Sequence, residues 1–257
     1  MAWIYSNWER VAIDISEGKI PDWKRNPHVT YMLEHESHDA ARAYIKYLRE
    51  CGISDVELQR LAELNDMYGT ATISDFLGIR TSPSSIRYIR HAYDACQEIL
   101  KMNLSPVTMI EVGGGYGGLA LITFEMAKLL GVNLEKYVIY DLPGVQQLQK
   151  YYLGLHGVTT VEWRSCTLYG SDTASDVAEG KNLYLVSHYC MGEIPGPQRA
   201  AYLGNLLPVV RGAFFAWNNG SVADFDGWNG QKTICPEDPD TSGGHVPGGN
   251  KVVRLYK

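Results

Sequence analysis

The sequence predicts an α/β fold in which a doubly wound, mostly parallel sheet follows an N-terminal helical region. From Val107 onward, short apolar runs alternate with helix-like segments, which is the pattern of parallel strands joined by crossover helices. At the first of these runs, residues 109–118 read Met-Ile-Glu-Val-Gly-Gly-Gly-Tyr-Gly-Gly, so a strand, a glycine-rich turn and the start of a helix follow one another. We therefore expect a helical region at residues 1–105 and an α/β domain at residues 106–257.

Composition excludes several classes of function. The chain has 257 residues with 23 Lys and Arg against 29 Asp and Glu, a formal charge of −6. Nucleic-acid affinity comes largely from basic side chains on phosphates, so we expect no nucleic-acid partner. Residues 1–9 lack a signal-like pattern, and the apolar stretch 119–130 is interrupted by Glu125 and Lys128, so we expect no membrane segment. Five scattered cysteines without metal-ligand spacing fit reduced thiols, no bound metal and a cytoplasmic location.

The first 107 residues are predicted to be helical and to contain no strand. Residues 41–49 combine alanines with alternating charges, and Ser54 with Glu57 forms a capping box that opens another helix. Residues 65–70 are predicted to form a loop. Ser84, after a proline, is expected to cap a long helix. Its buried stripe has helical spacing at Ile86, Ile89, Tyr93, Cys96 and Leu100.

The α/β domain is predicted to contain six strands with crossover helices between them. The strands are expected at residues 108–112, 137–140, 159–163, 183–186, 213–217 and 251–255, and the crossovers at 117–130, 145–155, 172–179 and 198–209. Residues 241–250, with four glycines and a proline, are expected to form a loop. A doubly wound sheet binds its ligand beyond the carboxyl ends of its strands, so the residues after each strand are the site candidates.

The glycine cluster fits two classes of cofactor. Positions 113, 115 and 118 satisfy the dinucleotide pattern G-x-G-x-x-G, whereas Glu111 and the glycines at 113, 115 and 117 satisfy the acid-x-Gly-x-Gly-x-Gly pattern of S-adenosylmethionine (SAM) enzymes. A carboxylate repels a pyrophosphate and attracts the cationic amino-acid end of SAM, which favours SAM. A turn without any ligand is the remaining alternative. The residues expected to line the cofactor here are Glu111, Gly113, Gly114, Gly115 and Tyr116.

Residues after the second and third strands are expected to complete the cofactor site. Asp141 lies 23 residues beyond Gly118, where a carboxylate can accept both hydroxyls of a ribose; its alternative role is to cap the following helix. Leu142 follows it directly. Ser165 and Cys166 end the third strand and are placed to flank an adenine ring.

The fourth strand ends in a polar segment, residues 187–193, which we expect to lie nearest the reacting atoms. Ser187 is expected to contact the cofactor. Histidine can act as a base near neutral pH, so His188 is the candidate base, and Glu193 could orient it or hold a substrate hydroxyl. The alternative for His188 is a structural histidine that bonds to backbone.

Five segments of the chain carry a resemblance to a known family. They are Glu111-Val-Gly-Gly-Gly-Tyr-Gly-Gly-Leu, Tyr140-Asp-Leu-Pro, Ser187-His-Tyr with Glu193, Asn65-Asp66 with Gly69, and Ser82-Pro-Ser-Ser-Ile-Arg-Tyr. From about Asn26 to its end, the chain resembles the sugar O-methyltransferase family of class I SAM-dependent enzymes. That resemblance implies a seven-stranded, Rossmann-like class I methyltransferase sheet and SAM as cofactor.

The glycine segment and Asp-Leu-Pro are also similar to plant-type small-molecule O-methyltransferases, whose catalytic histidine follows the fourth strand, as His188 does. This chain has Tyr189-Cys190 where that family has Asp-Trp, and its N-terminal region shows no evident winged-helix dimerisation domain. The sequence therefore favours the sugar-type resemblance.

The predicted function is SAM-dependent O-methylation of a small polar acceptor, a sugar or glycosylated metabolite. His188 would remove the hydroxyl proton and Glu193 would support it. The expected acceptor contacts are Tyr88, Tyr189, Trp217, Asn218, Asn219 and His245; core packing is an equal alternative for Tyr88 and Trp217. A plant-like natural-product methyltransferase, a non-catalytic SAM-binding module and a dehydrogenase remain open alternatives. The N-terminal helices could also form a homo-oligomer.

Overall fold

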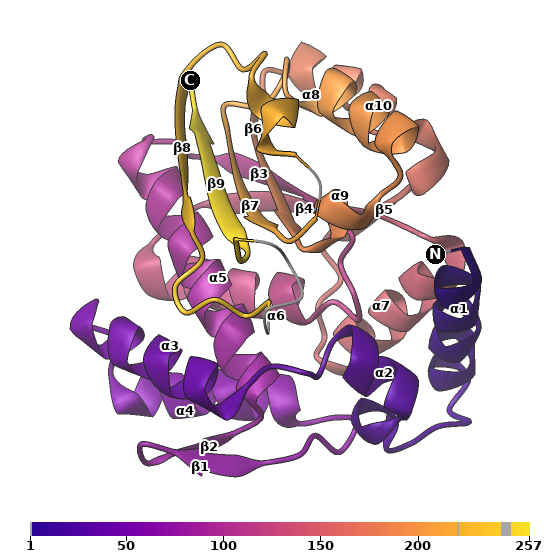
Figure 1. Ribbon diagram of the computed structural model, residues 1–257, viewed down its shortest axis with the longest axis vertical. Helices are drawn as coiled ribbons and strands as arrows, with labels where there is room; N and C mark the ends of the chain where they lie inside the picture. Colours follow the sequence, from indigo (N-terminus) through magenta and orange to yellow (C-terminus); the bar gives the residue numbers. More distant parts are fainter. Residues whose placement is uncertain (1, 220, 243–247) are drawn as a thin grey trace. The chain divides into compact units, whose positions relative to one another are not determined.

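The computed structural model describes residues 2–219, 221–242 and 248–257, which form two compact units (Figure 1). One unit comprises the described residues up to Asp94 together with Gly115–Met126 and Leu142–Thr159. The other comprises Ala95–Gly114, Ala127–Asp141 and the described residues from Thr160 onward. The chain therefore passes repeatedly between the units, and we describe each by itself.

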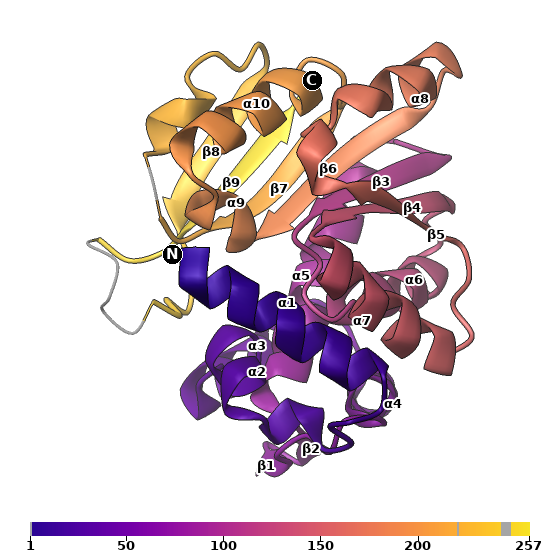
Figure 2. The ribbon, with the colours of Figure 1, turned by 90° about the vertical axis from the view of Figure 1, so that its right-hand side faces the viewer.

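The first unit is mainly helical. Its elements are α1 (Ala2–Ser16), η1 (Trp23–Arg25), α2 (Pro27–Met32), α3 (His38–Glu50), α4 (Asp55–Asp66), β1 (Ser74–Phe76), β2 (Ile79–Thr81), the first part of α5 (Pro83–Lys101), most of α6 (Gly118–Leu130) and α7 (Pro143–Leu155). Figure 2 shows α1 beside α7, and the Gly144 N–H donates to Glu9 Oε1 at 2.8 Å. As predicted, the Ser54 side chain caps α4 by accepting from the Glu57 N–H.

The second unit contains a seven-stranded sheet. Its strands are β3 (Val107–Val112), β4 (Leu134–Asp141), β5 (Val161–Ser165), β6 (Asn182–His188), β7 (Gly212–Trp217), β8 (Gln231–Pro236) and β9 (Lys251–Tyr256). Their order is β5-β4-β3-β6-β7-β9-β8, and β9 runs antiparallel to both β7 and β8. The short elements are η2 (Cys166–Leu168), η3 (Ser171–Thr173), α8 (Ala174–Ala178), α9 (Cys190–Glu193) and η4 (Val222–Phe225), and the longer helix is α10 (Gly196–Leu206). The doubly wound, mostly parallel sheet is confirmed.

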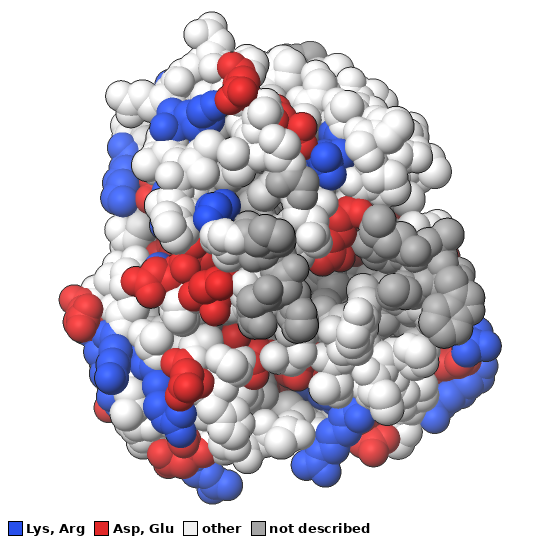
Figure 3. Space-filling view, in the orientation of Figure 1, with Lys and Arg blue, Asp and Glu red and all other residues white. Residues whose placement is uncertain are grey.

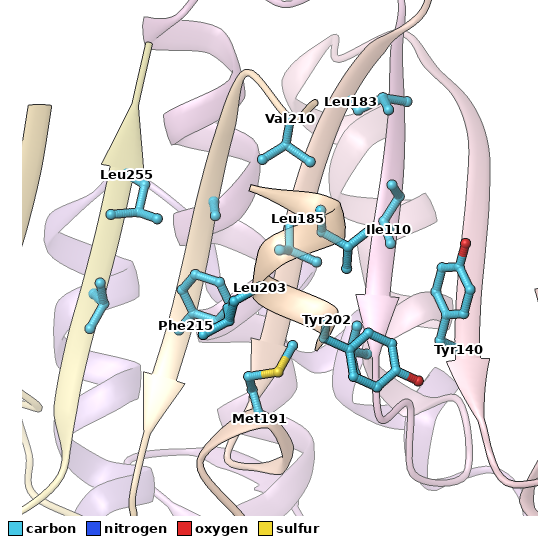
Figure 4. Close-up of a cluster of buried hydrophobic side chains, with 14 of the residues drawn as sticks. Ile110, Tyr140, Leu183, Leu185, Met191, Tyr202, Leu203, Val210, Phe215 and Leu255 are labelled. Carbon is cyan, nitrogen blue, oxygen red and sulfur yellow. The ribbon is translucent and has the colours of Figure 1, made fainter. Parts of the chain in front are cut away.

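One face of this sheet is covered by α10 (Figures 2 and 4). Tyr202 and Leu203 of α10 belong to the same buried cluster as Ile110, Leu185 and Phe215, which come from three adjacent strands (Figure 4). Apolar side chains at alternate positions of each strand point to this face. The carboxyl ends of the strands are thereby held at fixed positions, which is what a site at that edge requires.

Several local predictions were wrong. β1 and β2 form a hairpin in a region expected to be helical. The turn of this hairpin places Leu77 at φ +56° and Gly78 at φ +87°. It was missed because leucine is not a residue that indicates a turn with positive φ. β8 was missed because its edge position leaves it largely exposed and polar. α4 extends to Asp66 instead of ending before residue 65. α5 begins at Pro83, and Ser82, rather than Ser84, accepts from the Ser85 N–H.

Among the described residues, no helix is long and apolar enough to cross a bilayer. No disulfide joins the five cysteines, all of which lie in described segments. On the face shown in Figure 3, Lys and Arg form no continuous basic patch over the described surface.

Candidate active site

The glycine turn between β3 and α6 is the first part of the candidate site. Gly113, Gly115 and Gly117 have φ values of +80°, +54° and +96°, which glycine adopts without steric cost. A Cβ at Gly113 would overlap the side chain of Cys190, so this position also requires glycine for space. The Gly113 N–H donates to the Tyr140 carbonyl at 3.0 Å, which joins the turn to β4.

Asp141 ends β4 and bonds to the same turn. Its Oδ2 accepts from the Gly114 N–H at 2.9 Å. Leu142 is the N-cap residue of α7, and its own side chain makes no capping bond. The Asp141 carboxylate lies against the glycine backbone, as its predicted place in the cofactor site requires.

Glu111 is a buried acid on β3. The Tyr137 hydroxyl donates to its Oε2 at 3.0 Å. Burial raises the Glu111 pKa to about 8; the Tyr137 hydrogen bond opposes this rise, and the negative charge of Asp141 adds to it. None of these influences is cationic, so a cationic ligand beside Glu111 would lower its pKa and favour its ionised form.

Cys190 is a buried thiol whose pKa is affected by three of the predicted acids. Burial raises the pKa of Cys190 well above its usual range, and the charges of Asp141, Glu193 and Glu111 raise it further. Cys190 thus stays protonated and acts as an uncharged packing group under the glycine turn. Sequence reasoning assigned it no role, although its place two residues after β6 could have indicated one.

Ser187 and His188 end β6 beside β3 and β7. The Ser187 hydroxyl is buried, donates to the Val112 carbonyl at 2.8 Å and accepts from the Met191 N–H at 3.0 Å, so it joins two strand ends. The half-buried His188 ring packs edge-on against Phe214, with 5.4 Å between centroids. His188 lies opposite Ala216 in register, and its role as base stays a prediction.

Tyr189, directly after His188, adopts φ +63°, a strained value for a bulky residue. Its N–H donates to the Ala216 carbonyl at 2.7 Å. Its hydroxyl donates to Glu237 Oε1 at 2.5 Å and lies 3.2 Å from Thr241 Oγ1. The segment after β8 therefore holds the residue that follows the candidate base, a connection that no sequence pattern indicated.

Glu193 and Asn218 form a polar pair. Asn218 Nδ2 donates to Glu193 Oε1 at 2.5 Å, and the next residue, Asn219, is exposed. Trp217, in contrast, is 2% exposed and packs edge-on against Phe225 at 4.9 Å, so its indole is part of the core. His245 lies outside the described residues.

The remaining predicted residues lie elsewhere in the two units. Ser165 caps η2 through its hydroxyl, which accepts from the Thr167 N–H, and Cys166 begins that turn. Gly115, Tyr116, Leu142 and Tyr88 belong to the first unit, where Tyr88 and Tyr116 are buried and pack edge-on at 5.6 Å. Among the described residues, no group of three or more His, Cys, Asp or Glu is placed to hold a metal ion.

Numbered along the main sheet, the strand order is 3-2-1-4-5-7-6 with the seventh strand antiparallel, and a glycine turn follows the first strand. This order and this turn define the class I methyltransferase fold. No family model matches the chain, and no curated protein matches it.

Several solved structures with a similar fold are methyltransferases of different kinds. The chain is similar to the methyltransferase domain of bacterial CtHen1, with 11% identity, a TM-score of 0.47 and coverage of 65% of this chain and 97% of that one. It is also similar to the plantazolicin methyltransferase BpumL in complex with SAH, with 10% identity, a TM-score of 0.45 and coverage of 95% and 99%. A third similar structure is the mitomycin 7-O-methyltransferase MmcR, with 9% identity, a TM-score of 0.39 and coverage of 66% of this chain and 56% of that one. Likenesses this distant concern the fold alone.

Proposed function

We propose that the protein is a SAM-dependent methyltransferase that acts on a hydroxyl group of a small polar acceptor. One observation carries the proposal: the glycine turn after β3 is bonded to the carboxylate that ends β4, next to a buried acid at the end of β3. Asp141 would accept the ribose hydroxyls of SAM, and Glu111 would face its cationic amino-acid end.

The charge of these groups favours SAM over a dinucleotide. The charges of Glu111, Asp141 and Glu193 each raise the pKa of the Cys190 thiol, which packs against the turn at Gly113. The negative charge of Asp141 beside the turn repels a pyrophosphate and attracts a sulfonium or ammonium group. A dehydrogenase is the weaker candidate for this reason.

When bound, SAM would supply an electrophilic methyl group for transfer to the acceptor oxygen. The chain's own task is to align the acceptor and to take its proton. His188, at the end of β6, is the proposed base. Glu193, with one carboxylate oxygen accepting from Asn218, is the proposed hydroxyl holder.

We propose a sugar or glycosylated metabolite as acceptor, supported by the resemblance in the strand-end segments and by the polar Glu193–Asn218 pair. Tyr189 and Asn219 remain proposed contacts to the acceptor. The Trp217 indole is better explained as core. A plant-like acceptor and a SAM-binding module without turnover are the alternatives. Homo-oligomer formation through the N-terminal helices is a separate proposal that accompanies either.

Thermal-shift measurements with SAM, SAH and NAD test the cofactor. We expect SAM and SAH to raise the melting temperature and NAD to leave it unchanged, since only a ligand of the folded state stabilises it. Labelled SAM mixed with pools of sugars and of plant-like phenols then tests the acceptor. Stabilisation by NAD alone would contradict the proposal, and SAM binding without labelled product from any pool would favour the non-catalytic module.

A further inference from the structure

We propose that Tyr116 is a positioning residue for the glycine turn and that a buried polar network centred on Asn65 holds it in place. This inference rests on the proposed function, because it concerns how well the turn binds SAM. It also gives a role to the Asn65-Asp66 and Ser82–Ser85 segments, which the candidate active site does not use.

The Tyr116 side chain is fixed at both its ring and its hydroxyl. The hydroxyl donates to Glu34 Oε1 at 2.9 Å and accepts from Asn65 Nδ2 at 3.0 Å. The fully buried ring packs edge-on against Trp23 and Tyr152, each 4.9 Å away between centroids. Every one of these groups belongs to the first unit.

Asn65 is fully buried, and its side-chain amide is engaged at both ends. Nδ2 donates to Ser85 Oγ at 2.7 Å as well as to Tyr116, and Oδ1 accepts from the Tyr152 hydroxyl at 3.0 Å. The Lys24 ammonium donates to the Asn65 carbonyl at 2.5 Å and lies 4.9 Å from the Tyr116 ring centre. Asn65 thus has one orientation available, and that orientation points a donor at Tyr116.

Asp66, the last residue of α4, connects this network to the start of α5. Its carboxylate accepts from Thr81 Oγ1, from both the N–H and the hydroxyl of Ser82, and from Ser85 Oγ, at 2.7 to 2.9 Å. These bonds join the end of α4 to the start of α5. The position of Asn65 is therefore set by backbone elements on both sides.

The glycine turn is packed tightly against the network. A Cβ at Gly118 would lie 2.7 Å from the Tyr116 ring, 2.8 Å from the Tyr88 ring and 3.0 Å from Asn65 Oδ1. The Gly115 carbonyl accepts from Gln149 Nε2 at 3.1 Å. Residues 115–118 cannot shift without disturbing Tyr116, so the tyrosine sets the position of backbone amides proposed to face SAM.

Tyr116→Phe keeps the ring and removes only the hydroxyl. We expect SAM binding, measured by calorimetry, to weaken about tenfold, as for a lost hydrogen bond in a buried network, and the KM for SAM to change more than kcat. The matched control is Tyr47→Phe, which removes a 2.8 Å bond from a tyrosine hydroxyl to Asp94 in the same unit. The control should lower the melting temperature and leave SAM affinity unchanged.

Asn65→Ala and the double variant test whether both residues act through one bond. We expect the variant that combines Asn65→Ala with Tyr116→Phe to have about the same SAM affinity as whichever single variant binds SAM less tightly. The reason is that the second change removes a hydrogen bond that the first has already removed. If Asn65→Ala does not fold, Tyr116→Phe and its control decide alone. Unchanged SAM affinity in folded Tyr116→Phe overturns the inference only, whereas a parent that binds no SAM overturns both it and the proposed function.

Discussion

The Gly114 N–H donates to Asp141 Oδ2 at 2.9 Å, so the turn after β3 and the end of β4 are held together by a carboxylate and not by backbone alone. The same carboxylate raises the pKa of Glu111, which places both acids at one edge of the sheet. A single side chain thus shapes the turn and contributes charge to the proposed cofactor site.

We expect Asp141→Ala to weaken SAM binding by roughly 1.5–3 kcal/mol, the usual loss for hydrogen bonds to a charged group. Calorimetry checks the affinity, and circular dichroism checks folding. Asp226→Ala is the matched control: this exposed aspartate pairs with Lys232 on the surface, and its loss should leave SAM affinity unchanged. Equal SAM affinity in parent and folded Asp141→Ala would remove Asp141 from the site.

Glu111 makes stability depend on pH. Its folded-state pKa of about 8 lies above the ordinary value of 4.5, so between these values the folded state holds a proton that the unfolded state lacks. The stability present below pH 4.5 is lost as pH rises toward 8, by at most about 1.4 kcal/mol per pH unit. Glu111→Gln should flatten this fall in urea unfolding between pH 5 and 8. The exposed Glu63→Gln should not, and identical slopes in parent and Glu111→Gln would contradict the assignment.

Gly115 has φ +54°, and a Cβ there would lie 3.1 Å from Leu33 Cδ2. We expect Gly115→Val to abolish SAM binding while the sheet still forms, because a branched residue resists positive φ and shifts the turn. Equilibrium dialysis with labelled SAM measures the loss. Gly157→Val is a useful comparison, since that glycine also has positive φ but no atom within 4 Å of its missing Cβ. Retained SAM binding in Gly115→Val would place the cofactor elsewhere.

Trp217→Ala should destabilise the protein by about 3–5 kcal/mol, the usual cost of removing a buried aromatic side chain. Chemical denaturation gives this value. The gentler Trp217→Phe should leave the acceptor KM unchanged if the indole serves only the core. A several-fold rise in KM without loss of stability would restore Trp217 as an acceptor contact.

The sequence predicted the main sheet well because its buried parallel strands are apolar runs, and because these runs lie between segments with the hydrophobic spacing of helices. β3, β4, β6, β7 and β9 lie within a few residues of their expected bounds, and β5 begins two residues later than expected. The β1–β2 hairpin and β8 were not predicted, because short strands and edge strands bury few side chains and so show only a weak alternation of apolar and polar residues. The bonds from Asn65 to Tyr116 and from Tyr189 to Glu237 span 51 and 48 residues, and no local pattern encodes such distant contacts.

The last prediction concerns His188, on which the mechanism depends. It ends β6 opposite Ala216, beside the residue whose side chain bonds to Glu237, and Ser187 before it is fixed to β3. If His188 removes the acceptor proton, His188→Ala should keep SAM affinity and lower kcat by about 10²–10⁴. The parent rate should rise with pH over the range in which an imidazole loses its proton, and the variant should lose that dependence.

Glu193→Gln separates the two roles. It keeps an oxygen that can accept from Asn218 Nδ2 but removes the charge, so it should raise the acceptor KM more than it lowers kcat. Steady-state kinetics at several pH values with the identified acceptor supply both numbers. If Glu193→Gln abolishes turnover while His188→Ala stays active, the glutamate is the base and the histidine packs against Phe214 as a structural group.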